Sequence, residues 1–440
     1  MDRPAATLTR VKRYLWRAAA SAVAAGVLLS NAAVVASAEE PDVFRASRCD
    51  FNQPTQEGQL LDAWHLQRLR MEEVWPLATG KGVTVAVIDT GVSTDGSLYY
   101  APDRVRAFDF VGVSDDERDK KVKVDCLHGT FVTSLLAAGL RPDGGSVNPL
   151  TNFAGIAPDV DVLAYRALAH SALPPEEGGQ APPPESLEPA VNAVNAAIDA
   201  GADIINLSLT VQRNVPFFDE FEAAINRAVS AGIIVVAAAG NGDQNVGPLF
   251  PASFPGVVAV GMSTEQESAH RMSYAWSEAE IGAPGAGIVG LAPSQPDLNA
   301  TTANQAFHLD TGTSFAAPIV SGVIALMLDY DQAMGRERAT AEEIVTRLQA
   351  TADPPPASAP DRQLGWGIVN PLRALMDTRP APMSTEAAGF TAPPPPTPEA
   401  EPVDARMPVL GLGVAVGAVL AVGLGVVAAI AIPAATRRAR

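Results

Sequence analysis

Thr311-Gly312-Thr313-Ser314-Phe315-Ala316-Ala317-Pro318 is the stretch around which the fold and the chemistry of this chain are organised. It joins a turn to a long apolar run, 314–328, whose apolar residues recur with helical spacing. Pro318 is predicted to lie in the first helical turn, where its missing N–H has no consequence. Ser314 then lies at the N-terminus of a buried helix, which favours negative charge beside its hydroxyl. This position suits a serine that takes part in chemistry. The alternative is that Ser314 is an ordinary N-cap, which only caps the start of the helix.

Upstream of this helix, β-branched runs alternate with helical stretches. The first run, 83–89, ends in Asp89 and is followed by Thr90-Gly91. Ligands in parallel sheets bind beyond the carboxyl ends of the strands, so Asp89 is placed for chemistry. The alternation predicts an α/β domain with a mainly parallel central sheet and helices on both faces. Similar runs are 160–165, 203–209, 232–239 and 257–261, with helices predicted at 129–140, 189–200 and 218–231, and surface loops at 115–121, 143–148, 170–189 and 294–305.

Length and charge limit the classes of function. The chain has 440 residues, enough for one large domain with appendages, and its net charge is −18. Nucleic-acid binding requires a basic surface, so we expect no nucleic-acid partner.

The N-terminal segment is predicted to be a secretory signal peptide. Residues 1–38 have basic residues, an apolar run and Ala36-Ser37-Ala38, which together predict a cleaved signal peptide. An uncleaved N-terminal anchor is the alternative. Residues 39–80 are interpreted as an extension wrapped on the main domain at 81–378, because they carry Trp64 and Trp75 but are too few to fold alone. A disordered leader is the alternative to that extension.

The C-terminus is predicted to cross a membrane. A Pro-rich linker, 379–408, precedes an uncharged stretch, 409–432, that is long enough for a transmembrane helix. The basic tail, 433–440, should stay cytoplasmic, which places the main domain outside the cell membrane. Small residues recur every four positions in the predicted span: Gly413, Gly417, Ala421 and Gly425. This spacing favours close packing against a partner helix. The alternative is that it only reflects the abundance of Gly and Ala in the chain.

The chain has two cysteines, Cys49 and Cys126. Outside the cytoplasm such a pair predicts a disulfide. Two unpaired buried thiols are the alternative. The disulfide would attach the N-terminal extension to a loop two residues from His128.

Three separated residues together suit acyl transfer. His128-Gly129-Thr130 opens an apolar helix, Asp89 ends a strand and Ser314 starts a helix. Ser314 would attack a carbonyl, His128 would act as general base and Asp89 would orient the imidazole. Asn241, which follows the strand 232–239 and Gly240, is a suitable donor to the oxyanion. This chemistry uses no cofactor and no metal ion.

These motifs resemble those of the subtilisin-like serine proteases over residues 80–375, in that family's order of Asp, His and Ser. The resemblance implies Asp89, His128 and Ser314 as the catalytic triad of an endopeptidase that acts on a protein or peptide substrate, with Asn241 as oxyanion donor. It also implies two edges that bind the substrate strand and flank the S1 pocket: Ser208 and Leu209, and Ala238, Ala239 and Gly240.

The layout of signal peptide, short extension, Pro-rich linker and C-terminal span further resembles the mycosins, the membrane-anchored subtilisin-like proteases of actinobacterial type VII secretion systems. That resemblance implies a type VII secretion membrane complex as partner. A scaffold subunit whose proteolysis is secondary is the competing function. An esterase is disfavoured because no Gly-x-Ser-x-Gly surrounds Ser314.

The chain departs from many subtilisins in two respects. Fifty residues separate the predicted cleavage site from Asp89, so we expect no separately folded inhibitory pro-domain. Thr210 stands where many relatives have Gly, and its bulk narrows the predicted entrance to S1. Leu249 resembles the residue at the base of that pocket and favours small P1 side chains.

Overall fold

The computed structural model describes the residues that build the sheet, its helices and the proposed site. The predicted signal peptide, Cys49, the four predicted loops for the most part, the linker, the transmembrane span and the basic tail lie outside the described residues. The described ranges are 62–93, 99–101, 103–111, 126–139, 152–168, 186–242, 247–274, 279–293, 307–356 and 358–377.

The centre of the domain is a seven-stranded sheet in which every neighbouring pair is parallel, in the order β2-β3-β1-β4-β5-β6-β7. The chain enters at β1, extends the sheet on one side through β2 and β3, and then crosses to β4 on the other side. Asp89, at the end of β1, therefore lies beside the point where the strand order reverses, the usual ligand position in such sheets. The strands are β1 (Thr84–Asp89), β2 (Val105–Asp109), β3 (Asp161–Arg166), β4 (Ile204–Leu207), β5 (Ile234–Ala238), β6 (Val257–Ser263) and β7 (Ile281–Pro284).

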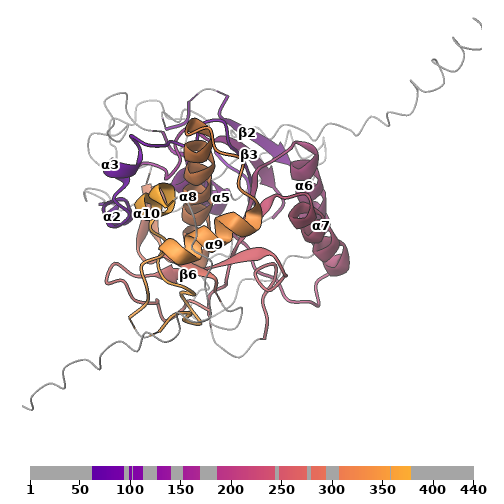
Figure 1. Ribbon diagram of the computed structural model, residues 1–440. Helices are drawn as coiled ribbons and strands as arrows, with labels where there is room; N and C mark the ends of the chain where they lie inside the picture. The colour runs from indigo at the N-terminus through magenta and orange to yellow at the C-terminus, as the bar shows by residue number, and fades with distance from the viewer. Residues whose placement is uncertain are drawn as a thin grey trace, which may run out of the picture. The chain divides into compact units, whose positions relative to one another are not determined.

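Helices cover both faces of the sheet, so the predicted α/β fold is confirmed (Figure 1). The helices α6 (Glu188–Asp199) and α7 (Phe218–Ser230) pack on one face, and α5 (Leu127–Ala137) and α8 (Thr313–Ala333) pack on the other. The helices α9 (Ala341–Thr351) and α10 (Pro371–Met376) follow α8. An antiparallel hairpin of β8 (Ile288–Leu291) and β9 (Phe307–Asp310) leads into α8.

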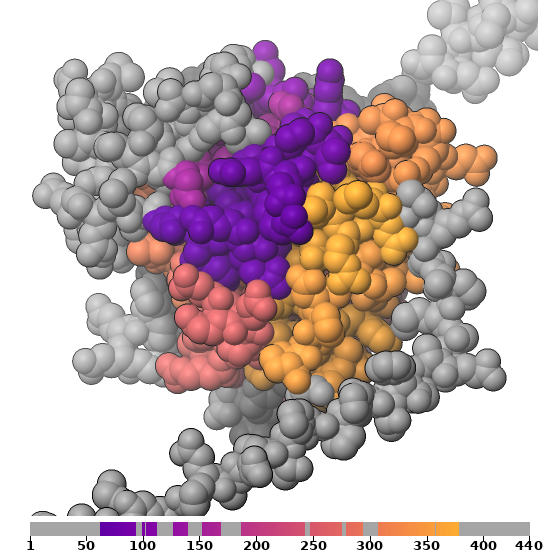
Figure 2. Space-filling model, turned by 60° about the vertical axis from the view of Figure 1, so that its left-hand side comes forward, coloured from indigo at the N-terminus to yellow at the C-terminus, as the bar shows by residue number. Residues whose placement is uncertain are grey.

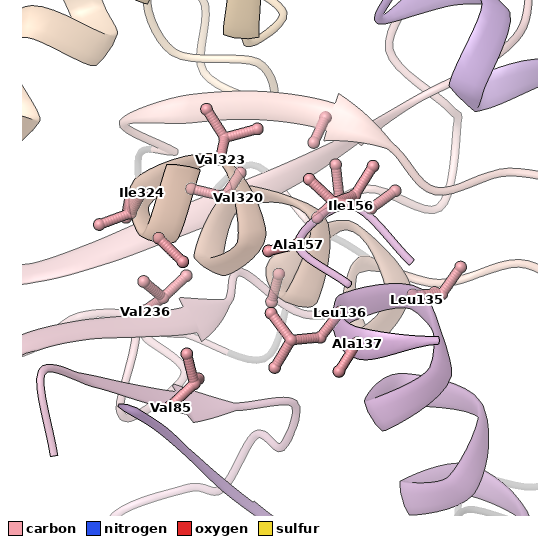
Figure 3. Close-up of a cluster of buried hydrophobic side chains, with 14 of the residues drawn as sticks. Val85, Leu135, Leu136, Ala137, Ile156, Ala157, Val236, Val320, Val323 and Ile324 are labelled. Carbon is pink, nitrogen blue, oxygen red and sulfur yellow. The ribbon is translucent and has the colours of Figure 1, made fainter. Parts of the chain in front are cut away.

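The helix α8 forms the centre of one hydrophobic core. Figure 3 shows Val320, Val323 and Ile324 of α8 among side chains from the sheet and from α5, including Val236 and Leu136. Among the described residues, α8 is the one helix long and apolar enough to span a membrane, but 83% of its apolar window is buried in the domain. It is therefore a core helix, and the predicted span 409–432 remains a separate prediction.

The described part of the N-terminal extension, 62–80, packs on the body of the domain. Its helices are α2 (Trp64–Arg68) and α3 (Met71–Val74). The Trp75 indole donates to the Ile156 carbonyl at 3.0 Å, and Arg68 pairs with Asp353 at 2.9 Å. Figure 2 shows this N-terminal segment, in indigo, beside the orange and yellow C-terminal part of the domain.

The helix predicted at 129–140 is present and spans Leu127–Ala137, so His128 lies inside its first turn. The prediction that Pro318 lies in the first turn of its helix is wrong. In α8 the N-cap is Gly312, and therefore Ser314 is not the N-cap and Pro318 is the sixth helical residue, beyond the first turn. The sequence did not predict the strands β2 and β7, the β8–β9 hairpin or the helices α2, α3, α9 and α10. The predicted loop 170–189 is shorter at its end, because α6 starts at Glu188.

Candidate active site

Asp89 and His128 form a direct pair at the carboxyl end of β1. The Asp89 side chain is buried, with 1% of the residue exposed. Its Oδ1 lies 2.8 Å from Nδ1 of His128 and accepts the Thr90 backbone N–H at 2.7 Å. Because Nδ1 faces the carboxylate, the other ring nitrogen, Nε2, is left to exchange a proton with a neighbour.

A glycine lets α5 come close enough to β1 to make this pair. A Cβ on Gly129 would lie 2.1 Å from the Gly91 carbonyl oxygen, which no side chain permits. The Gly129 N–H donates to Oγ1 of Thr90 at 3.0 Å. The start of α5 is thus joined to the turn after β1, and His128 is held within reach of Asp89.

Ser314 is the second residue of α8, and contacts of its neighbour place it near His128. The ring of Phe315 lies 5.5 Å from the His128 ring, measured between centroids. Ser314 also lies at the positive end of a 21-residue helix, which stabilises negative charge that forms nearby. The structure therefore brings the three predicted triad segments together.

The amide of Asn241 is held in one orientation by Thr313. Its Oδ1 accepts the Thr313 backbone N–H at 2.9 Å and the Thr313 hydroxyl at 3.2 Å. The Gly240 N–H in turn donates to that hydroxyl at 3.0 Å. Nδ2 of Asn241 is therefore turned toward Gly312, and it lies 3.2 Å from where a Cβ on Gly312 would be. This geometry presents an N–H donor beside the turn that precedes Ser314.

The two predicted substrate-binding edges lie at the ends of β4 and β5, which are neighbouring strands: Ser208 and Leu209 follow β4, Ala238 ends β5, and Ala239 and Gly240 come after it. A Cβ on Gly240 would lie 2.5 Å from Cδ1 of Leu249 and 3.5 Å from Cγ2 of Thr210. Leu249 and Thr210 therefore gather over Gly240, where the φ of +111° also favours glycine. Leu209, Ala238 and Ala239 are buried. The Ser208 side chain is also buried, and its hydroxyl donates to the Ser314 carbonyl.

Thr90, Gly129 and Thr313 stand next to Asp89, His128 and Ser314 in the motifs, and this proximity is their one signal in the sequence. Their hydrogen bonds and close packing are visible only in the structure. Cys126 is fully buried directly before α5, and no free cysteine is found among the described residues. Its pairing with Cys49 stays a prediction. The described residues also contain no group of three or more potential metal ligands.

Similarity to known proteins shows the family to which the chain belongs. Residues 80–367 match the model of the Subtilase family (Peptidase S8), so the chain belongs to that family. Thermitase of Thermoactinomyces vulgaris is 29% identical over 287 residues, which cover 65% of this chain and 88% of thermitase. The chain is accordingly a subtilase-type serine endopeptidase, as its sequence predicted.

Within the family, the chain is related to the mycosins. Mycosin-1 of Mycobacterium tuberculosis (strain ATCC 25618 / H37Rv) is 32% identical over 405 residues, which cover 83% of this chain and 84% of the relative. The crystal structure of MycP1 with the N-terminal propeptide removed is 29% identical, with a TM-score of 0.54 over 72% of this chain and 98% of that one. A chain of an intact ESX-5 inner membrane complex is 26% identical, with a TM-score of 0.57 over 87% of this chain and 98% of that one.

Proposed function

We propose that Ser314, His128 and Asp89 form the catalytic triad of a membrane-anchored endopeptidase that acts outside the cytoplasm as part of a type VII secretion membrane complex. The observation that carries the catalytic part is the 2.8 Å contact between the buried Asp89 and Nδ1 of His128. A carboxylate in that position fixes the imidazole tautomer and stabilises the imidazolium that forms during acyl transfer.

The reaction proceeds in two halves. Ser314 Oγ attacks the peptide carbonyl while His128 Nε2 removes its proton, and a tetrahedral intermediate forms. Nδ2 of Asn241 donates to the oxyanion, and the N-terminus of α8 stabilises the same charge. His128 then protonates the leaving amine, the peptide bond breaks and an acyl-enzyme remains. Water hydrolyses the acyl-enzyme by the same route in reverse order.

Substitution of the nucleophile tests the triad. Ser314→Ala should lower kcat for a peptide substrate by on the order of 10⁴–10⁶ while leaving the fold intact, because only one small polar group is removed. Peptide hydrolysis and labelling by a serine-directed phosphonate measure the effect, and thermal unfolding checks the fold. Ser230→Ala, an exposed serine at the end of α7, is the matched control. Turnover that persists in well-folded Ser314→Ala protein would refute the assignment.

Two features support the location. The predicted signal peptide, 1–38, and the predicted transmembrane stretch, 409–432, favour an extracytoplasmic domain that is anchored at its C-terminus. The predicted disulfide between Cys49 and Cys126 would form in that compartment. The related chain within an ESX-5 inner membrane complex supports a secretion complex as partner.

The same relative favours a second function, as a scaffold subunit of such a complex. Deletion of the gene and replacement with Ser314→Ala separate the two functions. If secretion fails on deletion but is restored by Ser314→Ala, the assembly role dominates. If Ser314→Ala fails like the deletion, proteolysis is the essential activity.

A further inference from the structure

The backbone carbonyl of Ser314 lacks its usual helical donor. In an α-helix the carbonyl of a residue accepts the N–H of the residue four positions later. For Ser314 that residue is Pro318, which has no N–H and lies inside α8. The helix therefore leaves an unsatisfied acceptor on the residue that carries the nucleophile.

A side chain from the sheet satisfies this acceptor. The hydroxyl of Ser208, which follows β4, donates to the Ser314 carbonyl oxygen at 2.7 Å. Ser208 is 3% exposed, so its hydroxyl is shielded from water and depends on partners within the protein. Nδ2 of Asn206 donates to Ser208 Oγ at 3.0 Å, so the Ser208 hydroxyl hydrogen is directed at the Ser314 carbonyl.

The chain of hydrogen bonds closes on α8 itself. Ser321 Oγ, two helical turns beyond Ser314, donates to Oδ1 of Asn206 at 3.0 Å. Asn206 and Ser321 are fully buried. Since unpaired buried polar groups are costly, each member fixes the orientation of the next.

On the other side of the nucleophile, Thr313 is bonded to Asn241. The peptide units around Ser314 are thus attached to the ends of two neighbouring strands, β4 through Ser208 and β5 through Asn241. We propose that Ser208 is a positioning residue for Ser314, whose hydroxyl replaces the hydrogen bond that Pro318 removes and so holds the nucleophile against the carboxyl edge of the sheet. This inference rests on the proposed role of Ser314.

The proposal predicts an effect on the chemical step. Ser208→Ala should lower kcat by about 10–100-fold and change KM by less than about twofold, because a displaced nucleophile affects the reaction more than substrate binding. The rate of labelling by a serine-directed phosphonate should fall in parallel. Ser208→Thr keeps the hydroxyl and should stay within a few-fold of the wild-type kcat.

Pro318→Ala supplies the decisive comparison. It restores a backbone N–H that can donate to the Ser314 carbonyl. The kcat of Ser208→Ala/Pro318→Ala should therefore be at least about fivefold higher than the kcat of Ser208→Ala. Thr351→Ala is the matched control, because Thr351 also donates from a buried hydroxyl to a helix carbonyl, that of Arg347 at 2.7 Å in α9. It should lower the thermal stability without changing kcat.

Three outcomes would overturn the proposal: a wild-type kcat in Ser208→Ala, no recovery in a folded double variant, or, where the double variant does not fold, equal losses in Ser208→Ala and Ser208→Thr. Measurement of Ser314→Ala in the same assay distinguishes a failure of the positioning role of Ser208 from a failure of the proposed function. If Ser314→Ala is inactive while Ser208→Ala is unaffected, the positioning role alone fails. If Ser314→Ala remains active, the proposed function itself fails.

Discussion

Asn241 has its orientation set by Thr313, because two hydrogen bonds to Oδ1 direct Nδ2 toward the turn before Ser314. A donor fixed before the reaction stabilises an oxyanion without reorganisation. Asn241→Ala should therefore lower kcat by about 10²–10³ with little change in stability. Steady-state kinetics on a short peptide measures this effect, with Asn195→Ala on α6 as control. An unchanged kcat/KM would show that the amide serves another purpose.

We predict the size of the P1 side chain from the position of Leu249. Its Cδ1 lies over Gly240, within 2.5 Å of where a Cβ on that residue would be. We expect the wild-type protein to prefer Ala over Phe at P1, and Leu249→Ala to raise kcat/KM for Phe by about 10–100-fold, since pocket volume discriminates on that scale. Peptides that differ only at P1 provide the measurement, and Leu372→Ala in α10 is the control. A preference for Phe in the wild type would contradict this reading of Leu249.

At the scale of elements, one carboxylate joins the N-terminal extension to α8. Oδ2 of Asp329 accepts the backbone N–H groups of Thr79, Gly80 and Lys81 at 2.9, 2.9 and 3.1 Å. The segment between α3 and β1 is thereby attached to α8, the helix whose second residue is Ser314. Three backbone donors depend on this one side chain.

Asp329→Ala removes these acceptors and should lower the free energy of unfolding by about 2–3 kcal/mol, since hydrogen bonds to charged groups are the stronger ones. The kcat should not change, because Asp329 lies near the far end of α8 from Ser314. Urea denaturation measures the loss, and Asp199→Ala, an exposed acid at the end of α6, is the control. Equal stabilities of the two variants would argue against a joining role for Asp329.

At the scale of the whole molecule, a buried histidine links stability to pH. His65 of α2 is fully buried, and neither ring nitrogen has a hydrogen-bond partner among the described residues. It packs against the Phe153 ring, with centroids 6.5 Å apart. Burial lowers the pKa of His65 from 6.5 to about 3. The folded domain therefore holds this imidazole neutral where the unfolded chain binds a proton.

The sign of the effect follows from that difference. Below pH 6.5 the unfolded state binds one proton more than the folded state, so the free energy of unfolding falls as pH drops, until about pH 3. Between pH 7 and pH 5 the loss from His65 should be about 2 kcal/mol. His65→Leu should remove this part of the pH dependence in denaturation curves, and His270→Leu should not. Identical pH profiles for His65→Leu and the wild type would exclude the linkage.

Local sequence was sufficient for the parts of the fold whose signal is local. The β-branched run that ends in Asp89 and the helical spacing after Ser314 depend on neighbours within one element, so both predictions hold in the structure. The edge strand β2, by contrast, carries Arg106 and Asp109 among its five residues, and β7 is four residues long and ends in Pro284. Such short or polar strands are defined by pairing with a neighbour, which single-sequence periodicity does not report.

The amino-acid sequence by itself determined which groups are available for chemistry: an acid at a strand end, a histidine and a serine at helix starts, and an amide after a buried strand. Only the tertiary structure decided how those groups are held. Ser208 and Ser314 are 106 residues apart, and Asn241 and Thr313 are 72 apart. The sequence predicts no consequence of Pro318, yet its position within α8 leaves the Ser314 carbonyl to a donor that follows β4. Hydrogen bonds between distant segments leave no periodic pattern, because they depend on which strand ends the fold places side by side.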